Sequence, residues 1–340
     1  MAKQYREESN ANIENKISEL CALLPPKISE FNDSISFSTT PKTRLEYIKD
    51  LKTFMEYVVG TENLDTPLNI TLTILEDFNR RYFERYLTYL RRYEKDGKIY
   101  TNDNAAVKRK LASLRRFYKY LYNNDDIEKC NILKVENVTI KDKEIVKMDA
   151  RESNQFLNKV KSGTGTSDHA SKYHEKLKTR DLAIIYLMLS SGIRVSECVG
   201  IDMEDVNFET SSVKVIRKGG KEETVYFSDE AAGYLMEYYE ERKQIKTDKK
   251  YEHALFLSTQ KKRIGVRTVE IMVKKYGSAV GLSSISPHKL RSTFATNLYR
   301  QSGDIKLVAD KLGHSDINVT SSYYAEGRDL AESRNAVQYD

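Results

Sequence analysis

Residues 287–324 read PHKLRSTFATNLYRQSGDIKLVADKLGHSDINVTSSYY and hold most of the chemistry that the sequence displays. His288 and Arg291 stand three residues apart at the predicted start of a helix, and His314 follows a Lys-Leu-Gly step. Tyr323 and Tyr324 come shortly after that histidine. These side chains offer a cation, two imidazoles that can move protons and a phenol that can act as a nucleophile. The set suits attack on a phosphodiester without a metal ion.

Length and composition indicate a two-domain protein. At 340 residues the chain exceeds the size at which one hydrophobic core usually stops growing. The net charge of +6 and the pI of about 8.8 are only a mild indication of an acidic partner. Cys21, Cys130 and Cys198 lack metal-binding spacing and favour reduced thiols, with Cys198 in the core. Without a signal segment or a membrane-spanning run, we expect a soluble, cytoplasmic protein with no membrane partner.

Basic residues crowd the segment 80–119, where thirteen Lys or Arg accompany only four Asp or Glu. Tyrosines are interleaved with these charges, and most of them are predicted to pack in the domain. The segment is therefore a candidate surface for a polyanion, although solvated helix faces are an ordinary alternative. The candidate DNA-binding residues are Arg80, Arg81, Arg85, Lys108, Arg109, Arg115, Arg116 and Lys119.

The first part of the chain is predicted to be a small helical domain, residues 1–133, followed by a linker, residues 134–148. Apolar residues recur every three or four positions in several segments, which is the period of an amphipathic helix. Thr40 is a plausible start and Gly60 a plausible end of one of them. The predicted helices are a segment around 13–20, 43–59, 73–93 and 103–122.

The second part, residues 149–340, is predicted to be mostly helical with a small antiparallel sheet. Residues 162–178 are polar and are predicted to form a mobile surface insert, so that His169 and His174 are weak catalytic candidates. Gly219 and Gly220 favour a tight hairpin between strands at 213–216 and 224–227. The predicted helices are 149–161, 179–192, 228–246, 267–280, 287–301, 304–312 and 317–323, with a short helix opening at Arg194 and a tail at 326–340.

The upstream half of this second domain supplies further chemistry. Arg194 follows the break at Gly192, where a helix start also offers backbone N–H groups to an anion. Glu197 could support that arginine, and Lys218 sits at the hairpin tip. Each position alone also has a structural explanation, namely a buried ion pair, a surface turn or a helix cap. The candidate catalytic set is Arg194, Lys218, His288, Arg291, His314 and Tyr323, with Glu197 in support.

Five separate blocks of the sequence resemble the tyrosine recombinase/integrase family. They are GIRVSE, RKGGK, HKLRSTFAT, LGHS and a tyrosine nine residues beyond that histidine. Within the family the chain is most similar to the single-protein Xer recombinases of the XerS type, and the likeness covers nearly the whole chain. The blocks occur in the family's order and spacing, so the resemblance is specific.

The resemblance implies a role for each matching residue. Arg194 and Arg291 would clamp the scissile phosphate, and Lys218 would protonate the departing 5′ oxygen. His288 would assist proton movement near the nucleophile, and Glu197 would support the site. His314 would bind a nonbridging oxygen, and Tyr323 would be the nucleophile. The sequence departs from the common pattern at Ser292, where many members carry a histidine in a supporting position.

Two tyrosines compete for the role of nucleophile. Thr320 fits a T-x-x-Y pattern that ends on Tyr323, and the nine-residue spacing from His314 agrees with it. Some integrases carry the tyrosine one position later, which would select Tyr324. The sequence favours Tyr323 and leaves Tyr324 as the alternative.

The resemblance also implies a fold and an assembly. We expect a mainly α-helical, two-domain DNA clamp that cleaves and rejoins strands through a 3′-phosphotyrosyl intermediate and a Holliday junction. It would need no cofactor and no metal, and its substrate would be a double-stranded DNA recombination site. We expect a homotetramer on two such sites and a monomer or dimer in the absence of DNA. The protein would act in the cytoplasm, near the nucleoid. The tail at 326–340 would pack against a neighbouring subunit.

Several functional alternatives stay open at this point. Chromosome-dimer resolution and integration or excision of a mobile element share the same chemistry. The first would use a DNA translocase as partner, and the second a directionality factor. Two other functions are possible alternatives to recombination. One is a non-catalytic DNA-binding regulator, and the other is a DNA-relaxing enzyme like a type IB topoisomerase. The target sequence depends on which side chains reach the grooves of DNA and is not predicted.

Overall fold

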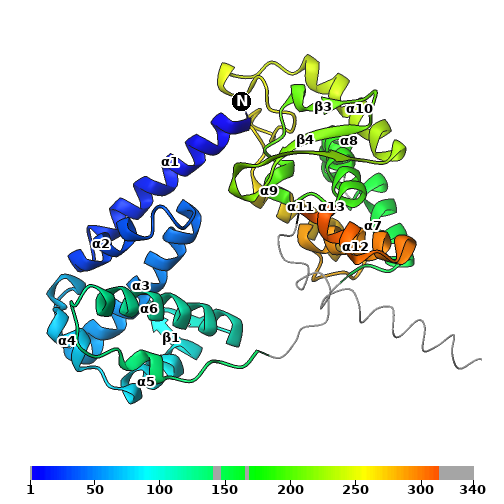
Figure 1. The fold of residues 1–340 in the computed structure, drawn as a ribbon. Coiled ribbons are helices and arrows are strands. Elements are labelled where there is room, and N and C mark those ends of the chain that lie inside the picture. Colours follow the sequence, from blue (N-terminus) through cyan, green and yellow to red (C-terminus); the bar gives the residue numbers. More distant parts are fainter. Residues whose placement is uncertain (1, 141–146, 165–167, 314–340) are drawn as a thin grey trace, which may run out of the picture. The chain divides into compact units, whose positions relative to one another are not determined.

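The computed structural model describes residues 2–140, 147–164 and 168–313, and its ribbon is mainly helical (Figure 1). The chain divides into two compact units, residues 6–143 and residues 144–340 with the first five. We call them the N-terminal unit and the C-terminal unit. The division falls inside the predicted linker 134–148, and the domain assignment itself stays a prediction. The mainly helical fold class with small antiparallel sheets is confirmed.

Helices dominate the first 143 residues. The α-helices are α1 (Ala2–Cys21), α2 (Pro26–Ser34), α3 (Pro41–Glu62), α4 (Leu72–Asp77), α5 (Arg80–Arg91) and α6 (Asn104–Asn123). Two 3₁₀ turns, η1 (Pro67–Asn69) and η2 (Asn131–Lys134), and a hairpin of β1 (Arg92–Lys95) and β2 (Lys98–Thr101) complete this part.

The start of α3 is confirmed and its predicted end is wrong. The Thr40 side chain accepts a hydrogen bond from the backbone N–H of Thr43 and so caps the helix. The helix passes through Gly60, which has open space around it, and ends at Asn63 with a left-handed φ of 50°. Asparagine tolerates this conformation better than most residues, so it can replace glycine as the terminator.

The predicted single helix over 73–93 is wrong. Asn79 accepts a hydrogen bond from the backbone N–H of Tyr82 and starts α5 as a separate helix after α4. The chain then forms the β1–β2 hairpin, whose two-residue turn, Asp96 and Gly97, has φ values of 50° and 69°. Tyr93 stacks between Tyr89 and the cross-strand Tyr100, with ring centroids 4.9 and 5.2 Å away. This stack stabilises strands that are too short to show a clear alternating pattern.

The C-terminal unit carries the second set of elements. The α-helices are α7 (Ala150–Ser162), α8 (Asp168–Ser191), α9 (Val195–Cys198), α10 (Asp229–Gln244), α11 (Val266–Ser278), α12 (Pro287–Ser302) and α13 (Ile305–Leu312). The strands are β3 (Val206–Asn207), β4 (Ser212–Ile216) and β5 (Glu222–Tyr226), and the 3₁₀ turns are η3 (Met203–Asp205), η4 (Lys218–Gly220) and η5 (Lys249–Tyr251).

Most of the elements predicted for this unit are confirmed. The three strands form one antiparallel sheet in the order β3-β4-β5, which contains both predicted strands. α8 packs against α10 and α12 and supplies much of the core, and the predicted core position of Cys198 is fully buried. The predicted helix 317–323 and the tail 326–340 lie outside the described residues.

The predicted mobile insert at 162–178 is wrong for most of its length, because α8 already begins at Asp168. His174 is buried on this helix, and its Nδ1 lies 3.3 Å from the hydroxyl of Tyr276. That hydroxyl also donates to Asp181 Oδ2 at 2.9 Å. Gly163 leaves the room that the imidazole needs, since a Cβ there would come within 2.7 Å of the ring. His174 is therefore a packing residue rather than a loop histidine.

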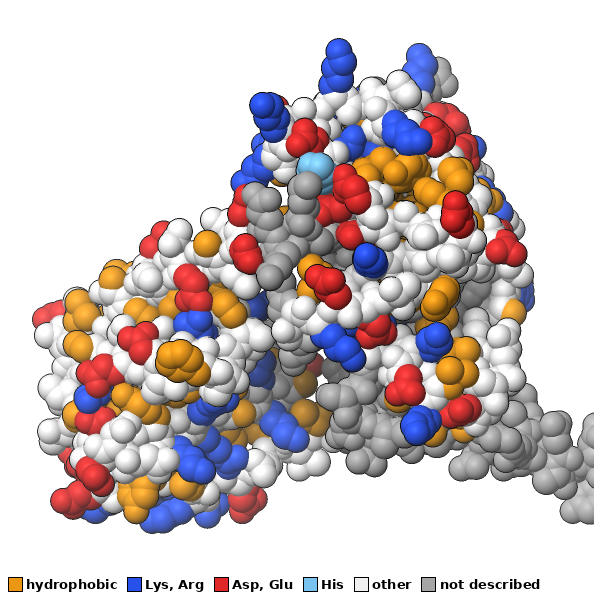
Figure 2. All heavy atoms as spheres, turned by 45° about the horizontal axis from the view of Figure 1, so that its top comes forward, with side chains coloured by type: hydrophobic (Ala, Val, Ile, Leu, Met, Phe, Trp, Pro, Cys, Tyr) orange, Lys and Arg blue, Asp and Glu red, His pale blue; other side chains and the backbone are white. Residues whose placement is uncertain are grey.

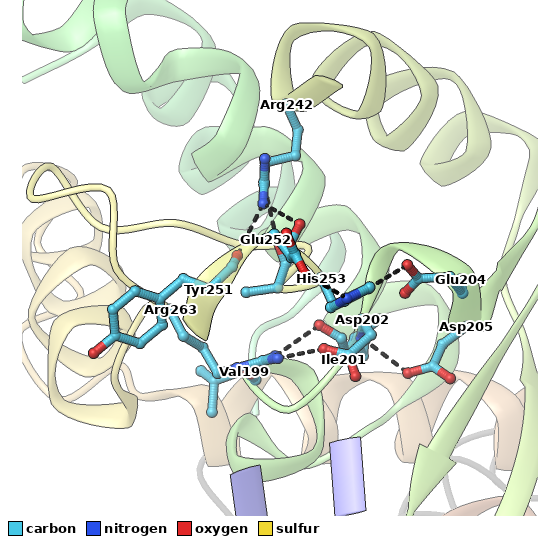
Figure 3. Close-up of polar contacts among 11 residues, drawn as sticks. Val199, Ile201, Asp202, Glu204, Asp205, Arg242, Tyr251, Glu252, His253 and Arg263 are labelled. Carbon is cyan, nitrogen blue, oxygen red and sulfur yellow. Dashed lines mark hydrogen bonds and ion pairs between the residues drawn. The ribbon is translucent and has the colours of Figure 1, made fainter. Parts of the chain in front are cut away.

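Two arginines, the buried Arg242 and the largely enclosed Arg263, hold the loop that follows α10 (Figure 3). The guanidinium of Arg242 donates to the backbone carbonyls of Ala254 at 2.8 Å and of Glu252 at 2.7 Å. Arg263 donates to the carbonyl of Ile201 at 2.9 Å and pairs with Asp202. Arginine suits this work because its donors form a planar fork that reaches several carbonyl oxygens at once.

Candidate active site

Arg194 and Glu197 form the first part of the site, with Arg194 directly before the single turn of α9 and Glu197 within it. The Glu197 carboxylate accepts from the backbone N–H of Arg194 and from its guanidinium, both at 2.8 Å. The Glu197 side chain is 3% exposed, whereas that of Arg194 is 33% exposed. The carboxylate thus holds one edge of a guanidinium that still reaches the surface. The backbone N–H of Arg194, which the sequence offered as an anion donor, is already used by Glu197.

Gly192 makes the turn that leads into this arginine. Its φ of +64° lies in the left-handed region, and a Cβ there would come within 2.3 Å of the Phe294 ring on α12. Only glycine fits both conditions. The Gly192 carbonyl is thereby presented to Arg291, whose guanidinium donates to it at 2.6 Å.

Arg291 joins three helices at the base of the site. It is buried on α12, and its guanidinium donates to Gly192 at the end of α8 and to the Leu312 carbonyl at the end of α13. Carbonyls at a helix C-terminus have no partner within their own helix and carry partial negative charge. A cation is therefore stabilising at both places.

His288 lies beside both arginines. It occupies the first turn of α12, directly after Pro287, and its side chain is exposed. Partial desolvation, followed by the positive charges of Arg291 and Arg194, lowers the pKa of His288 below its usual value. The imidazole is consequently neutral at pH 7 and able to accept a proton. The structure thus brings Arg194, Arg291 and His288 together from α9 and α12.

The β4–β5 hairpin carries Lys218 at its tip. Gly219 and Gly220 have φ values of 89° and 90°, so the prediction that both accept positive φ is confirmed. Lys218 opens the turn, and the side chain of this residue lies outside the described part of the chain.

Gly313 ends α13 with a φ of 59°. His314, Tyr323 and Tyr324 follow outside the described residues.

Arg217 is a polar residue of this region that the motif analysis missed. It is 5% exposed, and its guanidinium donates to Glu197 Oε2 at 2.9 Å, to Glu223 Oε1 at 3.0 Å and to the Lys311 carbonyl at 3.0 Å. In the sequence it is one more basic residue in RKGGK, a composition typical of a surface turn. Its burial follows from partners that are distant along the chain.

The candidate DNA-binding residues of the N-terminal unit divide into two groups. Arg109 pairs with the buried Asp50 at 2.6 Å, Arg115 binds the Val135 carbonyl and Asn137, Arg116 binds Tyr47 at 3.3 Å, and Arg80 pairs with Glu84 at 2.6 Å. Within the described residues, no hydrogen bond or ion pair holds Arg81, Arg85, Lys108 or Lys119, and all four are exposed. The second group is the more available to an external phosphate.

Figure 2 shows Lys and Arg side chains mixed with Asp, Glu and hydrophobic side chains over the visible face of the N-terminal unit. Among the residues that the structure covers, no cluster of three or more His, Cys, Asp or Glu could hold a metal ion. None of the described helices is both long and apolar enough to cross a membrane.

The comparisons with known proteins identify the class. A model described as the phage integrase family matches residues 147–329, which is more than half of the chain. The chain therefore belongs to the phage integrase family, the tyrosine recombinases, which cleave and rejoin DNA at specific sites. The resemblance noted in the sequence is confirmed.

Its relatives include individual recombinases over nearly their full length. The chain is 33% identical to the tyrosine recombinase XerS of Lactococcus lactis subsp. cremoris, over 94% of this chain and 95% of the relative. It is also 33% identical to XerS of Streptococcus uberis, over 91% and 94% of the two chains.

Solved structures share the fold at lower identity. The XerH site-specific recombinase bound to palindromic difH substrate matches with a TM-score of 0.65 and 19% identity, over 88% of this chain and 80% of that one. The Tn1549 transposon integrase in complex with circular intermediate DNA matches with a TM-score of 0.64 and 19% identity, over 88% and 94% of the two chains.

Proposed function

We propose that this recombinase cleaves DNA with Tyr323 as nucleophile, Arg194 and Arg291 as the phosphate clamp and His288 as the group that accepts the phenolic proton. Lys218 protonates the departing 5′ oxygen, His314 binds a nonbridging oxygen, and Glu197 supports Arg194. The product of cleavage is a 3′-phosphotyrosyl bond. A 5′-hydroxyl from another strand attacks that bond and rejoins the DNA.

The proposed chemistry follows from charge. In-line attack on a phosphodiester adds negative charge to the nonbridging oxygens, so two fixed guanidiniums stabilise the transition state more than the ground state. A phenol has a pKa near 10 and needs a base and nearby cations before it attacks. Since the covalent bond stores the energy of the broken one, no nucleotide or metal is required for the reverse step.

One observation carries this proposal: Arg291 donates to the carbonyl of Gly192, two residues before Arg194, so the two arginines come together from distant parts of the chain, with His288 one turn before Arg291 on α12. Partial desolvation and the charges of Arg291 and Arg194 lower the pKa of His288, which favours the neutral imidazole that can accept a proton.

Covalent trapping tests the proposal. The protein is incubated with sheared DNA from its source genome and then with a nicked duplex that carries the recovered site. We expect the wild type and Tyr324→Phe to form covalent adducts, and Tyr323→Phe to form none. Adducts with Tyr323→Phe and none with Tyr324→Phe would transfer the role to Tyr324.

The same duplex separates the alternative functions. A non-catalytic regulator would form no adduct with any variant. A relaxing enzyme would form the adduct but no Holliday junction, whereas a recombinase forms both. The family membership and the XerS relatives support the last outcome.

We further propose that the substrate is a double-stranded recombination site, bound in the cytoplasm by four subunits on two sites. The XerH and Tn1549 neighbours, which were solved with DNA, support a DNA partner for this fold. The location of the trapped sites in the genome then assigns the role. One chromosomal site supports dimer resolution, with a translocase as the expected partner, and sites at the ends of an element support integration or excision, with a directionality factor.

A further inference from the structure

Arg217 lies at the centre of the polar network around the candidate site. Three of its partners belong to three separate elements: Glu197 on α9, Glu223 on β5 and the Lys311 carbonyl at the end of α13. The side chain of Arg217 is 5% exposed and that of Glu197 is 3% exposed. Because this arginine is buried, its hydrogen bonds fix both its own side chain and the groups that it contacts.

The contact with Glu197 bears directly on Arg194. One oxygen of the Glu197 carboxylate accepts from the Arg194 guanidinium at 2.8 Å, and the other accepts from Arg217 at 2.9 Å. Because a single carboxylate plane serves both arginines, Arg217 and the backbone N–H of Arg194, which bind the same oxygen, together fix the direction in which Glu197 presents its other oxygen. Charge-assisted hydrogen bonds of this kind are strong and directional.

The contact with Lys311 fixes a second part of the site. Arg217 and Arg291 donate to the consecutive carbonyls of Lys311 and Leu312 at the C-terminus of α13. Gly313 follows with a left-handed φ, and a Cβ there would come within 3.1 Å of Arg217 Nε. The end of α13 is therefore packed closely against this arginine, and a larger residue at 313 would require the Arg217 side chain to shift.

We propose that Arg217 is a positioning residue for strand cleavage, acting through Glu197 on the orientation of Arg194. It does not contact the scissile phosphate itself. The inference rests on the proposed function in one respect, the assignment of Arg194 to the phosphate clamp. It adds a residue outside the motif set to the machinery that prepares this clamp.

The primary test is Arg217→Gln, measured in single-turnover cleavage of the nicked duplex that carries the trapped site. Because a misplacement of about 1 Å can lower a rate about 100-fold, we expect a loss of that order at saturating protein. DNA affinity should stay at the wild-type value, since Arg217 is buried. Arg217→Lys retains a cation but not the fork that reaches three partners, so its rate should be intermediate.

A matched control is Arg242→Gln in the same unit. Arg242 is equally buried and binds several backbone carbonyls, but its partners lie in the loop of Figure 3. Both variants are expected to lower the thermal unfolding temperature. At a temperature where both are folded, only Arg217→Gln should slow cleavage, and equal slowing by the two variants would overturn the proposal.

A double-mutant cycle with Glu197→Gln tests the route of action. If Arg217 acts through Glu197, the double variant should cleave no more slowly than the slower single variant. Effects that multiply would assign Arg217 an independent role and contradict the proposal.

A substrate with sulfur at the 5′ bridging position provides a second check. Its thiolate leaves without being protonated, so it should restore the rate of a Lys218→Ala variant and not that of Arg217→Gln. Restoration of Arg217→Gln would mean that the residue acts through the hairpin lysine instead. Failure of the proposed function would show separately, as wild-type cleavage by Arg194→Gln.

Discussion

His288 has an environment that sets it apart from the other histidines. The chain has five histidines, so their ring protons can be followed individually by NMR during a pH titration. Since partial desolvation and the charges of Arg291 and Arg194 lower its pKa, we expect His288 to titrate below the usual value of about 6.5. Its neutral form therefore prevails at pH 7 and is lost only as the pH falls through the lowered value.

His253 is the internal control for this titration. Its Nδ1 lies 2.6 Å from Glu204, and this hydrogen bond raises the pKa of His253. It should titrate at a higher pH than His288. Arg194→Gln should move the midpoint of His288 upward, because loss of a positive neighbour favours the protonated ring. A midpoint for His288 at or above that of His253 would contradict the account of the site.

For individual residues, the sequence predicts those that stand in a recognisable motif. It does not predict those whose role depends on contacts formed by folding. Arg194, His288 and Arg291 stand in recognisable blocks, and the structure brings them together. Arg217 and His174 stand in polar stretches typical of surface, yet both are buried. Their partners, such as Lys311 and Tyr276, are far away in sequence, so a local sequence pattern could not predict these contacts.

Asp50 connects two helices of the N-terminal unit. Its carboxylate, on α3, is almost fully buried and accepts from three side chains of α6: Arg109 at 2.6 Å, Lys110 at 3.1 Å and Ser113 at 2.8 Å. Removing one member of a buried pair usually costs about 3–5 kcal/mol. Since Arg109 is half-exposed and can be solvated, we expect Asp50→Ala to lower the free energy of unfolding by about 3 kcal/mol, measured in urea.

Glu46 is the control for Asp50. It lies on the same helix, 3.8 Å from Arg109, but at the surface. An exposed ion pair contributes at most about 1 kcal/mol, so Glu46→Ala should leave the unfolding midpoint nearly unchanged. Equal losses for the two variants would show that burial is not the source of the effect.

Elements with a strong period are the predictable ones. The predicted helices 103–122 and 267–280 agree with α6 and α11 to within two residues at each end, because a stripe of apolar residues repeats along them. The β1–β2 hairpin was missed because its strands have four residues each and mix charges with tyrosines. The stack of Tyr89, Tyr93 and Tyr100 that stabilises it exists only after folding.

For the molecule as a whole, the affinity for DNA should reflect which cations are available. Lys108 and Lys119 are exposed on α6, whereas Arg115 on the same helix donates to the Val135 carbonyl and to Asn137. Each phosphate contact contributes about 0.9 to the slope of log affinity against log salt. We expect Lys108→Ala and Lys119→Ala each to reduce this slope by about 1, measured by fluorescence anisotropy with a mixed-sequence duplex.

Arg115→Ala is the comparison variant for the salt dependence. Because its guanidinium is already bound within the N-terminal unit, the variant should lower stability and leave the slope unchanged. Unchanged slopes in both lysine variants would place the DNA surface elsewhere on the molecule. The class of enzyme was predictable because the blocks keep their order, whereas the division between free and bound arginines depends on the fold.

The anchoring of α13 sets the point from which the distance available to Tyr323 is measured. Arg217 and Arg291 fix the carbonyls of Lys311 and Leu312, so the chain has a defined position up to Gly313. Tyr323 is ten residues beyond Gly313 in the sequence, and a fully extended chain of that length spans roughly 35 Å. Covalent length alone therefore allows Tyr323 to serve the phosphate clamp of its own subunit or that of any neighbour within this radius.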